Sequence, residues 1–243
     1  MKAWWAQTRA EIFMSFRRGE SLLLLIGIPV GLLVFFTETR VIRIHDPHPI
    51  NVLAPGVLAL SIMSSSFVLL SIATGFERSY GVLRRLTVTP LGRTRYLLAK
   101  VAATIVTEVV QVVIVSLVGL ALGWNPHGGL LGAVAIIGVV LLATTSFVSV
   151  GFVLAGTLRA EANLAASNGL YIVLLLMSGF IIPASELPHA VAQAVIGLPS
   201  GALGSAMHRV LGSGTGVGTG NLVSLCAWAI GAPALARRVF RFS

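Results

Sequence analysis

Long apolar runs constrain this chain more strongly than any other feature of its sequence. Six runs of near-spanning length occur, at residues 21–36, 52–75, 96–122, 130–157, 164–182 and 221–236. Because a helix rises about 1.5 Å per residue, about 20 apolar residues cross the roughly 30 Å hydrocarbon core of a bilayer. Only 10% of the residues are charged, whereas about a quarter are charged in a soluble domain. The sequence therefore predicts an all-α integral membrane protein with six transmembrane helices in a single domain, 1–243.

The segment before the first run, residues 1–18, is basic and amphipathic. Trp5, Ile12 and Phe16 share one face at helical spacing, while Arg9 and Arg17 lie where they can reach lipid phosphates. This pattern predicts a helix in the membrane interface, with a disordered basic tail as the alternative. No small-residue cleavage site follows the first run, so we expect a retained span rather than a signal peptide.

The stretch 185–211 is also fairly apolar, but Pro199 and Gly201 interrupt it near its centre. Counting it as a seventh span would also move Arg237 and Arg238 to the side opposite the other basic segments. We therefore predict a re-entrant helical hairpin in the outer leaflet, between the fifth and sixth spans.

The positions of the basic residues predict the orientation of the spans. Short cytoplasmic loops retain Lys and Arg, and with the N-terminus inside only Arg40, Arg43 and Arg209 of the seventeen Lys and Arg residues fall outside. Both termini and the connection between the second and third spans are thus predicted to be cytoplasmic. The net charge of +9 would suggest nucleic acid for a soluble protein. Here the basic residues flank the spans, so we expect membrane lipids and no nucleic acid as partners.

The connection at residues 76–91 carries a helical pattern of its own. An apolar stripe recurs at i, i+4, i+7 and i+10, at Phe76, Tyr80, Leu83 and Leu86. The arginines off this stripe are Arg78, Arg84 and Arg85. The spacing predicts one amphipathic helix over 76–89 that ends at Thr89-Pro90, since the residue before a proline is pushed out of helical geometry. This helix either lies on anionic lipid or serves as a lever for a cytosolic partner.

Motifs for catalysis are absent from the sequence. It contains no phosphate-binding loop, dinucleotide fingerprint, zinc-protease motif or nucleophile elbow. It also lacks a pair of nearby carboxylates for acid–base chemistry. We expect no catalytic residue and no metal site in this chain. A transport subunit driven by another protein and a stand-alone secondary transporter or channel both remain open, whereas a lipid-modifying membrane enzyme would need a constellation that we do not find.

Two separated stretches resemble one family. The stretch "ERSYGVLRRLTVTPLGRTRYLLAK" is similar to the cytosolic loop of ABC-2 type permeases, the membrane subunits of bacterial ABC exporters. The residues that match the loop pattern are Glu77, Arg78, Gly81, Leu83, Leu86, Thr89, Pro90, Leu91 and Lys100. The stretch "SGFIIPASELPHAVAQAVIGLPSGALGSAMHRVL" is similar to the family's segment after the fifth span. With six spans and an N-terminal amphipathic helix, the resemblance covers nearly the whole chain.

The resemblance implies a function and its partners. It implies a permease subunit that exports an amphiphilic drug, antibiotic or lipid across the bacterial inner membrane. Two copies of a separate ATP-binding subunit would bind the ATP and Mg²⁺, so this chain would hold no cofactor, and it would pair with a second permease copy, identical or related. The coupling residues implied are Phe76, Glu77, Arg78, Tyr80, Gly81, Leu83, Arg84, Arg85, Leu86, Thr89 and Pro90. The pair Arg84 and Arg85 departs from the commoner acidic form of the loop and predicts an acidic rim on the ATP-binding partner.

A few polar residues inside or beside the spans are the remaining candidates. Glu108 lies about 12 Å past Lys100 along the third span, and an ionisable group in a span is a functional candidate by default. Gln111 lies one turn further on. Glu108 either contacts cargo or a gate, or only bonds a neighbouring helix. The serines at 64–66 and the histidines of the outer side, among them His208, are expected to be ordinary structural residues rather than pathway or metal sites.

Overall fold

The computed structural model describes residues 2–17, 23–39, 49–87, 91–178 and 195–240. Within these ranges the regular elements are helices and no strand occurs. In chain order they are α1 (Lys2–Arg17), η1 (Leu23–Gly27), α3 (Ile28–Thr39), α4 (Ile50–Met63), η2 (Ser64–Leu69), α5 (Leu70–Ser79), α6 (Val82–Thr87), α7 (Gly92–Ala121), α8 (Gly129–Thr157), α9 (Ala160–Leu176), α11 (Pro199–Met207), η4 (His208–Gly212) and α12 (Thr219–Val239). The elements marked η are π-helical.

Four helices are long and apolar enough to cross a membrane. They are Ile50–Ser79, which runs through α4, η2 and α5 without a break, Thr94–Ala121, Gly129–Thr157 and Thr219–Val239. Two further apolar helices, Leu25–Thr39 and Ala160–Leu176, are shorter. The prediction of an all-helical membrane protein is thereby confirmed, while the count of six spans depends on the two shorter helices and stays a prediction.

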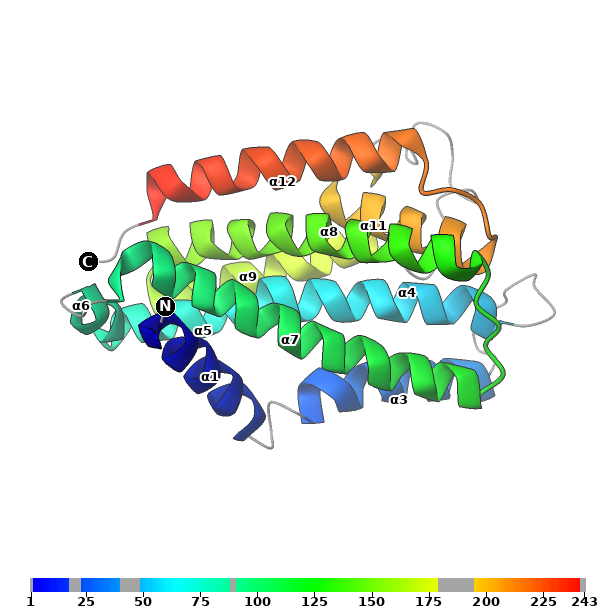
Figure 1. The fold of residues 1–243 in the computed structure, drawn as a ribbon, viewed down its shortest axis with the longest axis horizontal. Helices are drawn as coiled ribbons and strands as arrows, with labels where there is room; N and C mark the ends of the chain where they lie inside the picture. Colours follow the sequence, from blue (N-terminus) through cyan, green and yellow to red (C-terminus); the bar gives the residue numbers. More distant parts are fainter. Residues whose placement is uncertain (1, 18–22, 40–48, 88–90, 179–194, 241–243) are drawn as a thin grey trace.

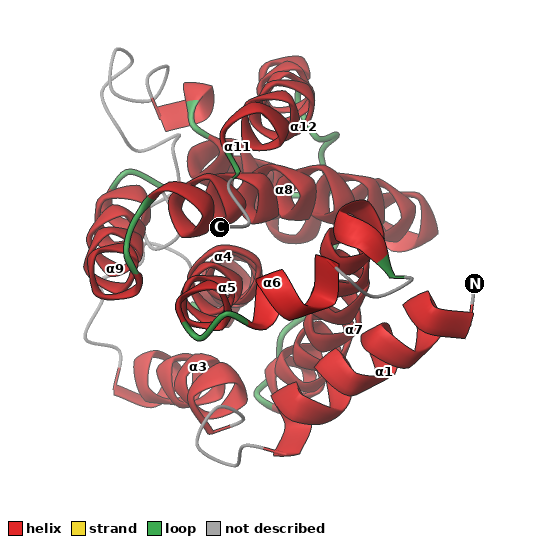
Figure 2. Cartoon of the chain, turned by 90° about the vertical axis from the view of Figure 1, so that its left-hand side faces the viewer, coloured by secondary structure: helices red, strands yellow, loops and turns green. Residues whose placement is uncertain are grey.

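The second predicted run forms the centre of the bundle. Figure 2 looks along the bundle and shows α4 and α5 surrounded by α3, α7, α8 and α9, with α12 beyond α8. Almost every residue of α4 is buried, and many are small, such as Ala54, Gly56 and Ala59. Small side chains let neighbouring helices approach closely, which is how helices associate where lipid removes the hydrophobic driving force. Larger side chains from α4, η2, α8 and α11 then fill the core at Met63, Phe67, Phe147, Leu203 and Met207.

The central helix changes its winding at the serine run. Ser64–Leu69 is π-helical, and the Ser65 and Ser66 hydroxyls donate to backbone carbonyls one turn back, at Ser61 and Ile62. A π-turn misaligns the regular hydrogen-bond ladder, and a serine hydroxyl can bond the carbonyl groups of the preceding turn. These two serines therefore satisfy their own helix, as the sequence led us to expect.

Helix α7 is apolar outside and polar inside. Its outward side chains include Leu98, Val109, Val113 and Leu117, which are half exposed or more. Its buried side chains form what we call the α7 polar stripe, Tyr96, Lys100, Thr107, Glu108 and Gln111. Hydrocarbon accepts the apolar face without cost, whereas ionisable groups in a span must face the bundle interior. The stripe brings polar groups along four turns of α7 against the centre of the bundle.

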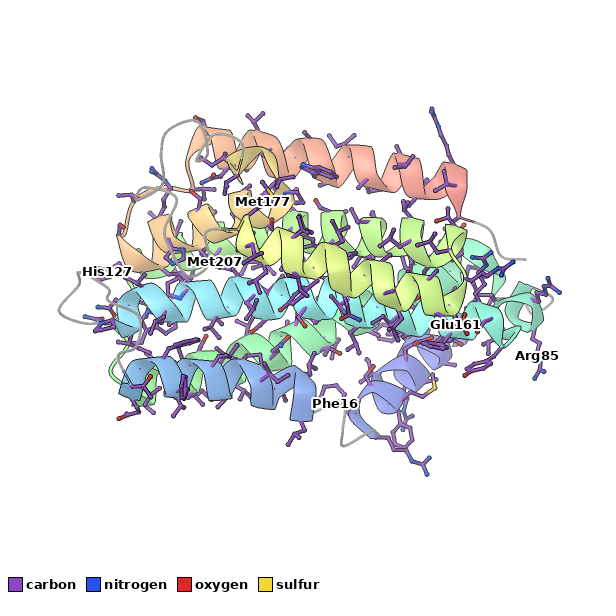
Figure 3. The ribbon with its side chains drawn as sticks, turned by 180° about the vertical axis from the view of Figure 1, so that it is seen from behind. Phe16, Arg85, His127, Glu161, Met177 and Met207 are labelled. Atoms are coloured by element: carbon purple, nitrogen blue, oxygen red, sulfur yellow. The ribbon has the colours of Figure 1, made fainter. Side chains whose placement is uncertain are left out.

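The elements gather at two ends of the bundle. Figure 1 shows α6, the first turn of α1, the start of α7 and the last turn of α12 at one end, which we call the α6 end. The other end, the η4 end, holds η4, the start of α8 and His127, which Figure 3 places opposite Arg85 and Glu161. The segments predicted to share the cytoplasmic side do lie at one end of the molecule, although no membrane is present to define the sides.

The predicted hairpin at 185–211 is described only from residue 195 onward. Leu198 is extended and Pro199 opens α11, so the chain does break where the proline predicts. Helix α11 is buried against α4, α8 and α12. The described half of this segment is thus a packed part of the bundle at the η4 end.

Candidate functional site

Three elements meet at the α6 end through one buried ion cluster. The Lys100 ammonium on α7 lies 2.9 Å from Glu11 Oε2 on α1 and 2.8 Å from Glu77 Oε1 on α5. The Tyr96 hydroxyl donates to the other oxygen of Glu77, and the Lys100 ammonium also lies 5.4 Å from the centre of the Tyr96 ring. Lys100 is 5% exposed. We call these four residues the Lys100 cluster.

The Lys100 cluster makes the α6 end rigid. A buried charge is costly unless it is paired and hydrogen-bonded, and here the one cation serves two carboxylates from different helices. If α1, α5 or α7 moved separately, a charge would stay buried without its partner. Breaking a buried ion pair in this way costs about 3–5 kcal/mol. The end of the central helix, the N-terminal helix and the start of α7 are therefore held as one unit.

Arg78 ties the same end to α8. Its Nη1 donates to the carbonyl oxygens of Ala155 and Leu158, at 3.0 and 3.2 Å. These are carbonyls of the last turn and C-cap of α8, which have no helical N–H partner and carry the negative end of the helix dipole. The adjacent residues Glu77 and Arg78 thus reach in different directions and fix α5 between α7 and α8.

A second polar network joins α5 to α8 and α9. Ser71 donates to Gly151 O and Asn163 Oδ1, at 3.1 and 2.9 Å, and Asn163 Nδ2 donates back to Ser71 O at 2.8 Å. Ser167 joins through Ser71 Oγ. A side chain at Gly75 would press on the Asn163 amide. The close packing and these bonds give Asn163 and Ser167 a structural role.

The prediction of one helix over 76–89 is wrong. Helix α5 ends at Ser79, Tyr80 leaves helical geometry, and α6 begins at Val82. The reason is Gly81, whose φ of +71° lies in the left-handed region, where glycine adopts the backbone without strain and ends helices. The break separates Phe76 and Tyr80 from Leu83, so the predicted stripe is not one continuous face. The Leu86 side chain, Thr89 and Pro90 lie outside the described residues.

Helix α6 has one buried anchor and an exposed face. Leu83 is 1% exposed and packs with Leu91 and Tyr96 in a small apolar cluster. Tyr80, Arg84 and Arg85 are exposed, and Figure 3 shows Arg85 at the extremity of the bundle. The predicted coupling residues therefore divide in two. Glu77, Arg78 and Leu83 hold the segment in place, and Tyr80, Arg84 and Arg85 face outward.

An open hollow lies beside this exposed face. It measures about 410 Å³ and is lined by Gly75, Arg78, Ser79, Gly81 and Arg84 on one side and by Leu158, Arg159, Ala160 and Glu161 on the other. The second wall is the connection between α8 and α9. Three of the lining residues are arginines, so the hollow suits an acidic or polar segment of another protein.

Glu108 and Gln111 lie away from the α6 end, deep inside the bundle. Thr144 on α8 donates to Glu108 Oε2 at 2.7 Å, and Gln111 Nε2 donates to the backbone oxygen of Leu25 in η1 at 2.6 Å. They are 2% and 1% exposed. The structure thus brings these two predicted residues together on one helix face, but it does not join them to the predicted coupling residues.

Sequence reasoning missed Glu11 and Tyr96. Glu11 is the one acidic residue of the basic segment 1–18, and such an isolated opposite charge is a signal for a buried partner. Lys100 is its partner across 89 positions. Tyr96 lies one turn before Lys100 on α7, which also could have been read from spacing.

The family described as ABC-2 type transporter matches residues 2–196. A search of curated proteins gave no match.

Proposed function

Because this chain belongs to the ABC-2 type transporter family, we propose that it is the membrane-spanning permease subunit of an ATP-driven exporter. A separate ATP-binding subunit docks at the α6 end and supplies the energy. The exposed residues Tyr80, Arg84 and Arg85 and the adjacent hollow form the docking surface. The observation that carries this proposal is the position of α6. This short helix is anchored by Leu83, which packs against Tyr96 of the Lys100 cluster.

A docking element can transmit force only if it is fixed to what it moves. The turn at Gly81 sets α6 off from the central helix, but Glu77 and Arg78, directly before the turn, are bound to α1, α7 and α8. A push on α6 therefore acts on several helices together. A loosely attached helix on the lipid surface would show none of these bonds.

The charge of the surface favours an acidic partner. The arginines of α6 and of the hollow lie together, and complementary charge speeds and orients association more than it adds affinity. An acidic groove on the ATP-binding subunit is the matching surface. Two copies of that subunit serve two permease chains.

The cargo pathway lies between two permease copies, identical or related. The long helix α7 turns its polar side chains inward and leaves an apolar face exposed. An amphiphilic drug, antibiotic or lipid matches such faces. The complex resides in the bacterial inner membrane with both termini of this chain cytoplasmic, and transport is outward.

Charge reversal on α6 tests the proposal. The double variant Arg84→Glu and Arg85→Glu should reduce co-purification with the ATP-binding subunit by at least tenfold and abolish cargo-stimulated ATP hydrolysis in reconstituted membranes. The matched control reverses Arg237 and Arg238, the adjacent exposed pair in the last turn of α12 at the same end. That control should keep both properties.

Two outcomes would contradict the proposal. Equal loss in both double variants would mean that net charge, rather than this surface, governs association. Full cargo transport by the purified chain without any ATP-binding subunit would instead favour the stand-alone secondary transporter.

A further inference from the structure

The deep part of the α7 polar stripe holds two oxygen atoms without partners. Glu108 Oε2 accepts a hydrogen bond from Thr144, but Glu108 Oε1 has no partner among the described residues. Gln111 Nε2 donates to Leu25 O, but Gln111 Oε1 likewise has no described partner. Both side chains are at least 98% buried. A buried acceptor without a donor destabilises the fold, and more so when it is charged.

Glu108 also has no counter-charge nearby among the residues that the structure describes. The elements that pack on α7 are α1, η1, α3, α4, η2, α6 and α8. In their described parts, η1, α4, η2 and α8 contain no charged residue or histidine, and α3 contains only Glu38, near its far end. The charged residues of α1 and α6 belong to the α6 end. The nearest cation on α7 itself is Lys100, about 12 Å away along the helix, and it already pairs with Glu11 and Glu77.

A carboxylate in this position would be a bare charge inside a membrane-spanning bundle, which is strongly unfavourable. A single proton on Glu108 would remove both the bare charge and the two oxygens without donors. On Glu108 Oε1 it neutralises the charge and turns that oxygen into a donor, and Gln111 Oε1 is a free acceptor three residues along the same helix face.

We propose that Glu108 is a proton-binding site. The carboxyl group carries the proton on Oε1 and donates a hydrogen bond to Gln111 Oε1, directly or through one water. This site is independent of the docking surface at α6. It makes the packing of α7 against η1 and α8 depend on a bound proton.

A partly polar hollow extends from the Lys100 cluster toward the level of Glu108. A hollow of about 60 Å³ between α1, η2, α5 and α7 is lined by Glu11, Lys100, Ser65, Thr104 and Thr107, among others. Thr107 precedes Glu108 on α7. A polar hollow of this size holds a few water molecules. The hollow reaches Thr107 but is not lined by Glu108, so a proton that passes between its water and Glu108 has to cross the side chains between them.

Infrared spectroscopy of the full chain in lipid tests the site directly. A protonated carboxylic acid has a carbonyl stretch separate from that of carboxylate. We expect such a band at neutral pH in the wild type and its loss in Glu108→Gln, an isosteric change that keeps the Thr144 bond. In Gln111→Leu the band should move to the frequency of a more weakly bonded acid, because the acceptor is gone.

A thermal measurement provides the second readout. The wild-type unfolding midpoint should fall as the solution becomes alkaline, because proton loss leaves the bare charge, and Glu108→Gln should not show this fall. Absence of a band that depends on Glu108, or identical alkaline behaviour of wild type and Glu108→Gln, overturns the proposal. Protection by sodium or potassium without an acid band overturns it too, since a metal cation would then be the ligand.

Discussion

The two ends of the bundle are held together by different interactions. At the α6 end, charged side chains from α1, α5 and α7 meet on Lys100. At the η4 end, side chains bond backbone oxygens instead. The two ring nitrogens of His208 lie 3.0 Å from Val52 O and 2.9 Å from Gly204 O, and the neutral ring donates to one of these oxygens. Arg209 Nε donates to Gly216 O at 3.0 Å. The first arrangement clamps separate helices next to the exposed arginines of α6, whereas the second joins neighbouring segments through their backbone.

The difference teaches how each end relates to its surroundings. Buried charge pairs are poor sources of stability but strong constraints, because breaking one partner leaves a bare charge. At the η4 end, hydrogen bonds from side chains to the backbone and the close packing of small residues stabilise the fold without a buried charge pair. Under the function proposed above, the α6 end transmits force and needs this constraint, whereas the η4 end only closes the bundle.

Removing the central cation should break the α6 end. Lys100→Met leaves Glu11 and Glu77 without their counter-charge. Because Glu77 keeps partial exposure, we expect a loss near the lower limit of the range, about 3 kcal/mol in the free energy of unfolding. Unfolding in detergent measures it. The triple variant with Glu11→Gln and Glu77→Gln should recover most of the loss. If it is no more stable than the single variant, burial of charge is not the cause.

A side chain added at Gly201 should break the η4 end by packing rather than charge. A Cβ at Gly201 in α11 would overlap the Val195 carbonyl, so Gly201→Ala should cost about 1–3 kcal/mol. The control is Gly138→Ala in α8, where nothing lies within 4 Å of the added carbon and alanine favours the helix. Unfolding midpoints compare the two, and equal effects would contradict the expected contact.

Acid should weaken the η4 end through His208. Burial lowers the pKa of His208, so the folded protein favours the neutral ring and the unfolded chain binds the extra proton more readily. Stability is therefore full above about pH 6.5, the ordinary histidine value, and is lost as pH falls below it. Histidine changes its charge between about pH 5 and 8. Thermal unfolding across this range measures how the unfolding midpoint depends on pH.

Two variants sharpen the His208 prediction. His208→Gln should abolish the acid slope and cost about 1–2 kcal/mol at neutral pH through lost hydrogen bonds. His127→Gln, at an exposed residue of the same end, should leave the slope unchanged. A slope that survives in His208→Gln would assign it to another group.

The smallest effect on stability is expected on the outward face of α6. Reversal of Arg84 and Arg85 should change the free energy of unfolding by no more than about 1 kcal/mol, as is usual for exposed charges. The same change should abolish docking. A large loss of stability would mean that these arginines hold the fold, and the distinction between anchor and outward face on α6 would fail.

Part of the candidate site was predictable from local pattern. The apolar runs, the burial of Leu83 and the candidacy of Glu108 all follow from hydropathy and helical spacing. The helix break between Ser79 and Val82 was missed, because the apolar spacing continues through Gly81 while the backbone does not. The glycine itself was the signal, since it ends helices so readily.

The sequence by itself determined that this protein is helical, membrane-embedded and of a family that needs an external source of energy. It did so because hydropathy and short motifs depend on neighbours along the chain. Only the tertiary structure decided that Glu11 and Glu77 share Lys100 and that His208 reaches Val52. It also decided that Glu108 and Gln111 each keep an oxygen with no partner among the described residues. These relations join residues on different helices or depend on what surrounds them, and the packing of the helices, rather than their order in the chain, brings such groups within a few ångströms.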